Sequence, residues 1–235
     1  MSINKKINTH IPHNLLSNKI WEKNMIMKKD IKDKLVTIAE SFIDYLGVSI
    51  DVKDITVTGS YANYNYTPYS DIDLHIIVNY DELTDIEDLP KEFFHAKKSF
   101  WNDRHDIKIK GIEVELYAQD ESEQHSSTGV YSIITDTWIV QPKKFKTKID
   151  NSSIKEKYKK IKKEIDESIK NSNKSKDAKH VERMLEKIRK MRKSGLEKGG
   201  EMSDENLTYK ILRNEGEIQK LFDLKDKLFD ISMSF

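Results

Sequence analysis

The chain has 235 residues, enough for one compact domain and a smaller appendage. It has no cysteine, which excludes disulfides and thiolate metal sites, and its formal net charge of +1 gives no global argument for nucleic-acid binding. No apolar run approaches the roughly twenty residues that span a bilayer, and the N-terminus lacks a secretory core. We therefore expect a cytoplasmic protein without membrane contact.

The N-terminal part predicts an irregular arm followed by one amphipathic helix. Residues 1–20 are polar and show few periodic signals. Within residues 19–46, apolar side chains recur at helical spacing, and Gly47 is placed to end the helix. We expect this helix to lie against a sheet.

A Gly-Ser pair and two closely spaced aspartates follow. Gly59-Ser60 ends one apolar run, and Asp71 and Asp73 open the next. Residues i and i+2 of a strand share a face, so the two carboxylates should lie side by side, which is costly without a cation between them. Mg²⁺ is the hard, oxygen-preferring cation that we expect. Gly59 permits close approach of the backbone to a ligand, and Ser60 offers an N–H and a hydroxyl to phosphate oxygens.

The segment after the Gly-Ser pair, residues 61–70, is rich in Tyr and Asn, and Pro68 suits a turn near its end. Its tyrosines either stack on a substrate or pack against the sheet. An acidic loop at residues 81–90 and a helix at residues 91–102 come next. The following Arg104 and His105 are either phosphate ligands or ordinary loop residues.

The next predicted element is a hairpin with two glutamates on one face. Residues 106–117 alternate between apolar and polar side chains, with Lys110-Gly111 at or near the turn. Glu113 and Glu115 share a face, so alternation does not choose between them. A polar loop at residues 125–129 has either a functional or a purely structural role, and a second short hairpin about Asp136 follows it.

The C-terminal third predicts a helical bundle, and we place a domain boundary between residues 148 and 149. Lys/Glu-rich segments with apolar stripes at helical spacing cover residues 155–170 and 177–195, with a polar linker between them. Ser203 suits a helix start. Lys210 and Arg213 lie three apart on one helical face, as phosphate ligands or as solvated charges.

The Gly59-Ser60 pair, its spacer and the Asp71-x-Asp73 strand resemble the motif of the polymerase-β-type nucleotidyltransferase superfamily. This resemblance implies an α+β fold, with a sheet flanked by helices and a C-terminal helical bundle. It also implies a short helix after Gly59-Ser60 and favours Glu115 over Glu113 as the third carboxylate. The runs NYNYTPYSDIDLH, VELYAQDESEQHSSTGVYS and NLTYKILRNEG look similar to small nucleotidyltransferases encoded by bacteriophages, which would place the protein in the host cytoplasm.

The resemblance further implies the transfer of a nucleoside monophosphate from an NTP, by default ATP, to an acceptor hydroxyl, with release of pyrophosphate. Asp71 and Asp73 would bridge two Mg²⁺ ions, for which Mn²⁺ can substitute, and Glu115 would complete the site. The acceptor stays open between a small molecule, a protein, a tRNA and another nucleotide. The alternatives are a cyclic or linear oligonucleotide synthase and a catalytically silent nucleotide-binding module. The residues expected to bind the NTP are Gly59, Ser60, Lys210 and Arg213.

Overall fold

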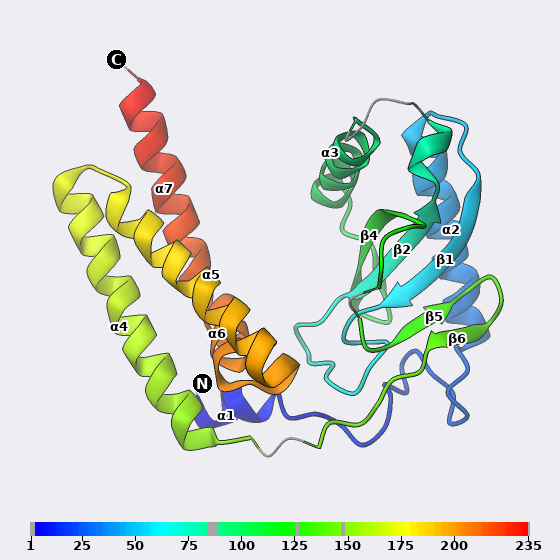
Figure 1. Cartoon of the computed structure of the whole chain (residues 1–235), viewed down its shortest axis with the longest axis horizontal. Coiled ribbons are helices and arrows are strands. Elements are labelled where there is room, and N and C mark those ends of the chain that lie inside the picture. Colours follow the sequence, from blue (N-terminus) through cyan, green and yellow to red (C-terminus); the bar gives the residue numbers. More distant parts are fainter. Residues whose placement is uncertain (1–2, 84–88, 126, 147–148, 235) are drawn as a thin grey trace. The chain divides into compact units, whose positions relative to one another are not determined.

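The structure is a computed structural model that describes residues 3–83, 89–125, 127–146 and 149–234 (Figure 1). The chain forms two compact units. One runs from Pro12 to Phe145, and the other combines the N-terminal residues up to Ile11 with the C-terminal residues from Lys146. The predicted domains, 1–148 and 149–235, differ from these units mainly in the first residues, which group with the C-terminal helices.

The first unit is built on a six-stranded sheet in the order β3-β4-β2-β1-β5-β6. β2 and β4 are parallel, and every other neighbouring pair is antiparallel. Helices flank this sheet and more helices follow it, so the predicted α+β fold is confirmed. The strands are β1 (Val52–Thr58), β2 (Ile72–Val78), β3 (Lys108–Ile109), β4 (Ile112–Asp120), β5 (Val130–Ser132) and β6 (Thr137–Val140).

The apolar face of the sheet packs against two helices. α2 (Lys29–Leu46) and α3 (Leu89–Arg104) contribute to a single core with side chains of β1, β2 and β4. Leu35 of α2 and Leu74 of β2 are both fully buried in it. Each strand alternates, so its other side chains point to the opposite face of the sheet, where the carboxylates lie.

α2 ends as predicted, at Gly47 in the left-handed conformation. The predicted start at residue 19 is wrong, because the helix begins ten residues later, at Lys29. Residues before it form a tight loop closed by a bridge between Trp21 and Met27. The Trp21 indole N–H donates to the Tyr61 carbonyl oxygen at 2.7 Å, so this segment is fixed by tertiary contacts rather than by helical periodicity.

α3 also closes the free edge of β4. The short strand β3 pairs with only the first residues of β4, which leaves later backbone groups at an edge. The Asn102 side chain donates to the Leu116 carbonyl oxygen at 3.0 Å and accepts from the Leu116 N–H at 3.1 Å. The C-terminal turn of α3 is thereby held beside the strand that carries Glu115.

Both predicted hairpins are confirmed. Lys110 and Gly111 both have positive φ angles, 51° and 78°, which is the geometry of a two-residue turn between β3 and β4. Asp136 has φ 59° in the turn between β5 and β6. Residues 84–88 of the predicted acidic loop, and Ser126 of the predicted polar loop, lie outside the described residues.

The second unit is helical. α1 (Ile3–Asn8) contacts α4 and α6 and buries Ile7, so the first part of the predicted irregular arm is helical and packed. Ser203 caps α6 by accepting from the Asn206 N–H, as predicted for a helix start. The other helices are α4 (Asn151–Ser175), α5 (Lys179–Gly199), α6 (Asp204–Asn214) and α7 (Glu217–Met233).

One prediction for this unit is wrong: residues 171–175 are not a linker. They are the last turns of α4, which ends at Lys176 in the left-handed conformation. Ser172 is fully buried there and its hydroxyl accepts from the Val181 N–H, so α4 is prolonged by packing against α5. Among the described residues, no helix of either unit is long and apolar enough to span a membrane.

Candidate active site

Three carboxylates converge on one face of the sheet. The parallel register of β2 and β4 places Asp73 directly beside Glu115, and Asp71 lies two residues before Asp73. One carboxylate oxygen from each of the three lies within 4.8 Å of the others, and all three residues are partly buried. Like charges at this spacing repel, whereas oxygen donors suit a hard divalent cation. The chemistry of this donor set therefore fits a metal such as Mg²⁺, although the identity of the metal does not follow from it.

The register also separates the two candidate glutamates. Pairing between β2 and β4 begins at Ile72 and Val114, so Glu113 lies just outside it and pairs with Lys108 of β3 instead. The Glu113 side chain is 66 % exposed, and its carboxylate lies 3.5 Å from the Lys108 ammonium. Of the two glutamates, Glu115 is the one that joins Asp71 and Asp73.

Gly59 lies against the carboxylate of Asp73. Its φ is +70°, and a Cβ atom placed there would lie 1.7 Å from Asp73 Oδ2. A side chain at this position would meet both backbone strain and a direct clash. Gly59 therefore lies close to one of the three acids. Its close approach to a ligand stays a prediction.

The polar loop before β5 reaches the Gly-Ser turn. The Gly59 N–H donates to Ser127 Oγ at 3.3 Å, and the Ser127 hydroxyl donates to the Gly129 carbonyl oxygen at 2.9 Å. A Cβ at Gly129 would lie 2.0 Å from the Ala62 carbonyl oxygen, so the loop packs tightly on this turn. The sequence left the role of the loop open, and its run of small polar residues was the only signal of this contact.

The short helix that the resemblance implied after Gly59-Ser60 is absent from residues 61–70, all of which the structure describes. Instead, the Asn63 N–H donates to the Ser60 carbonyl oxygen at 3.1 Å, which makes a single turn. Tyr61 and Tyr64 are buried, so these two tyrosines pack within the unit. The predicted turn at Pro68 is present and is closed by a hydrogen bond from the Ser70 N–H.

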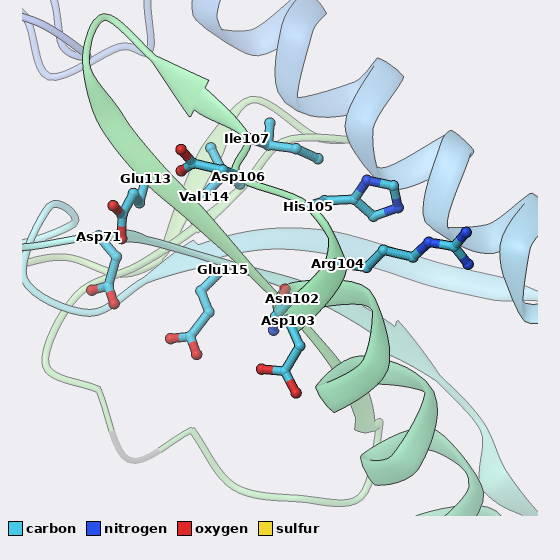
Figure 2. A pocket seen from close by; sticks show the side chains of 10 residues that line it. All are labelled: Asp71, Asn102, Asp103, Arg104, His105, Asp106, Ile107, Glu113, Val114 and Glu115. Carbon is cyan, nitrogen blue, oxygen red and sulfur yellow. The ribbon is translucent and has the colours of Figure 1, made fainter. Parts of the chain in front are cut away.

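A cavity of about 420 Å³ opens beside Asp71 and Glu115 (Figure 2). Further carboxylates line it, from Asp103 at the end of α3 and from Asp106 and Glu113. Figure 2 shows the side chains of the two cationic candidates on its rim extending away from Asp71 and Glu115. These are Arg104, whose guanidinium lies 5.6 Å from the Phe100 ring, and His105, whose ring lies 4.3 Å from that of Trp101.

Lys210 and Arg213 lie on α6, in the helical unit. Lys210 donates to Glu201 Oε2 at 2.5 Å. Both cations also face the buried His10, and burial together with these two charges lowers the pKa of His10 to about 4. The structure thus gives Lys210 an ion pair within its own unit, and the role of both residues as NTP ligands stays a prediction.

Comparison with known families agrees with this geometry. The model of the nucleotidyltransferase domain family matches residues 35–190, a range that includes the Gly-Ser turn and all three acids. No curated protein and no solved structure matches the chain. The resemblance to phage-encoded proteins accordingly stays a prediction. Because the match covers well over half of the sequence, the chain belongs to the nucleotidyltransferase domain family.

Proposed function

We propose that this protein transfers a nucleoside monophosphate from an NTP to an acceptor hydroxyl and releases pyrophosphate. The observation that carries the proposal is the gathering of Asp71, Asp73 and Glu115 within 4.8 Å in a chain of the nucleotidyltransferase domain family. The intact Gly59-Ser60 turn beside these acids argues against a catalytically silent relative, in which loss of at least one of these groups is expected.

Each residue has a role in this reaction. Asp71, Asp73 and Glu115 would hold two Mg²⁺ ions, which when bound supply charge neutralisation for attack at the α-phosphorus and for departure of pyrophosphate. The Ser60 N–H and hydroxyl would bind oxygens of the departing phosphates. Glu115, which lines the cavity, would accept the proton of the attacking hydroxyl. The remaining contribution of the protein is positioning, since no covalent intermediate with the chain is needed.

The cavity beside the acids favours an acceptor without phosphates. Besides the metal-binding acids, three carboxylates line it, from Asp103, Asp106 and Glu113. Arg104 in the lining and Lys108, which pairs with Asp106 and Glu113, compensate only part of this charge. The phosphates of an RNA would be repelled by such a lining, whereas a neutral or cationic hydroxyl compound would not. We therefore rank a small-molecule acceptor above a tRNA.

The test is incubation with each of the four α-³²P-labelled NTPs and Mg²⁺ or Mn²⁺, with and without tRNA or a small-molecule extract. We expect label to move onto a small molecule, and the transfer to be lost in Asp73→Asn. Label on RNA would overturn the choice of acceptor. Label in a phosphatase-resistant nucleotide without any acceptor would indicate an oligonucleotide synthase. NTP binding without turnover under every condition would indicate a silent module.

A further inference from the structure

Glu115 differs from the other two acids in how its carboxylate can be held. Glutamate has one more side-chain torsion than aspartate, so its carboxylate can take more positions relative to the strand backbone. Asp71 and Asp73 project from the start of β2 on short side chains. Glu115 projects from β4, where strand pairing fixes its backbone but not the rotation of its carboxylate. A precise position for this carboxylate needs support from outside the strand.

Tyr117 supplies that support. Its hydroxyl donates to Glu115 Oε2 at 2.5 Å, from two residues further along the same face of β4. A hydrogen bond of this length to a carboxylate is charge-assisted and among the stronger ones in proteins. It restrains the rotation of the Glu115 carboxylate through one of its two oxygens.

The Tyr117 ring is itself held by its neighbours. The His75 ring stacks on it, with centroids 4.8 Å apart and planes 18° from parallel. His75 is oriented in turn by Gln119, whose Oε1 lies 2.8 Å from His75 Nδ1. The Lys98 ammonium, from α3, lies 3.8 Å from the centroid of the Tyr117 ring, which is a favourable cation–π distance. Groups from β2, β4 and α3 thus determine where the hydroxyl points.

We propose that Tyr117 is a positioning residue that orients the Glu115 carboxylate for metal binding. The inference rests on the proposed function, because it assumes that Glu115 is a metal ligand. Groups that hydrogen-bond to a metal ligand typically change metal affinity or activity about 10- to 100-fold when they are removed. Nothing in the sequence alone singles out this tyrosine among the ten of the chain.

The test is Tyr117→Phe, which removes one oxygen atom and keeps the ring between His75 and Lys98. We expect Mn²⁺ binding without NTP, measured from the electron paramagnetic resonance signal of free Mn²⁺, to weaken about 10-fold. The Mg²⁺ concentration for half-maximal turnover should rise by a similar factor. Tyr80→Phe is the matched control, because the Tyr80 hydroxyl donates to the Ala118 carbonyl oxygen of the same strand and not to Glu115. This control should bind Mn²⁺ like the wild type.

Glu115→Gln, measured beside these variants, separates the two levels of the proposal. If Glu115→Gln binds Mn²⁺ like the wild type, the assignment of Glu115 in the proposed function is wrong. If Glu115→Gln weakens binding and Tyr117→Phe does not, only the positioning role is overturned. Equal weakening in Tyr117→Phe and Tyr80→Phe would also overturn it, because general loosening of β4 would then explain both.

Discussion

Acidic residues are treated differently in the two units of this molecule. In the helical unit, glutamates that face other helices are matched with lysines, as in the pairs Lys157–Glu205, Lys162–Glu217 and Lys187–Glu164. In the sheet unit, the structure instead brings Asp71, Asp73 and Glu115 within 4.8 Å of one another.

The two arrangements have opposite energetic signs. A carboxylate beside an ammonium lowers the cost of burying either group, whereas carboxylates within 4.8 Å of one another repel, and a bound cation would relieve that repulsion. A cluster of neighbouring carboxylates gives up stability, and such a local loss of stability is expected at a functional site. Each of the following variants removes one feature of this contrast.

Asp73→Asn should have the largest effect on function. We expect turnover to fall by about 10³-fold, equivalent to about 4 kcal/mol, because one ligand of the metal cluster is lost. The melting temperature should stay the same or rise, since repulsion among the acids is relieved. Steady-state rates with labelled NTP and thermal unfolding measure both. The control is Asp33→Asn on α2, which alters an exposed aspartate paired with Lys29. Wild-type turnover in Asp73→Asn would contradict the assignment of the metal site.

Glu115→Gln and Glu113→Gln form the next comparison. We expect turnover to fall by about 10²-fold in Glu115→Gln, from the loss of one charged contact in the site, and to change little in Glu113→Gln. The two residues lie on the same strand and face, and only Glu115 is opposite Asp73. A larger loss in Glu113→Gln would show that the third carboxylate has been assigned to the wrong residue.

Gly59→Ala tests how the turn supports Asp73. The left-handed conformation should cost about 1–2 kcal/mol of unfolding free energy, and the clash with Asp73 Oδ2 should lower turnover by more than the stability change explains. Gly111→Ala is a matched control, because Gly111 also has a positive φ but its Cβ would meet nothing within 4 Å. Denaturant unfolding and rates of both variants separate backbone strain from displacement of the carboxylate. Equal turnover in the two variants would argue against a role for the contact with Asp73.

Glu217→Gln should lower the stability of the helical unit, because it removes a carboxylate that is paired with lysines and not one that is repelled by other acids. The Glu217 side chain is 7 % exposed and pairs with Lys162 and Lys220, so we expect a loss of about 1–3 kcal/mol of unfolding free energy. Glu167→Gln on α4, which breaks an exposed pair with Lys163, should cost about 0.5 kcal/mol or less. A similar cost for both would mean that burial adds nothing to the Glu217 pair.

The Glu217 pair also predicts a pH dependence. Burial alone would raise the pKa of Glu217, but hydrogen bonds from Lys162 and Lys220 outweigh it and hold the pKa below its ordinary value of 4.5. A lowered folded-state pKa means that the stabilisation is present above pH 4.5 and is lost as the pH falls through the folded-state pKa. The difference in unfolding free energy between wild type and Glu217→Gln, measured by denaturant unfolding, should therefore shrink as the pH falls below 4.5. A constant difference down to pH 3 would contradict the pairing.

The sequence alone determined the features that depend on near neighbours along the chain. An apolar run and an alternating segment identified the strands that carry Asp73 and Glu115, and the turn between β3 and β4 followed from Lys110-Gly111. Local chemistry also gave the end of α2 at Gly47. The family resemblance carried by the Gly-Ser pair, its spacing and the two aspartates then implied the fold class and favoured Glu115 as the third acid.

Only the tertiary structure decided the features that depend on segments far apart in the sequence. Glu115 is distinguished from Glu113 by its register against β2, and register is set by packing of the whole sheet rather than by alternation within β4. The contact of Ser127 with Gly59, and the packing of His75 and Lys98 on the Tyr117 ring, also arise only when distant segments pack together. Side-chain periodicity records which face a residue occupies, but the partner across that face is chosen when distant strands and helices pack together.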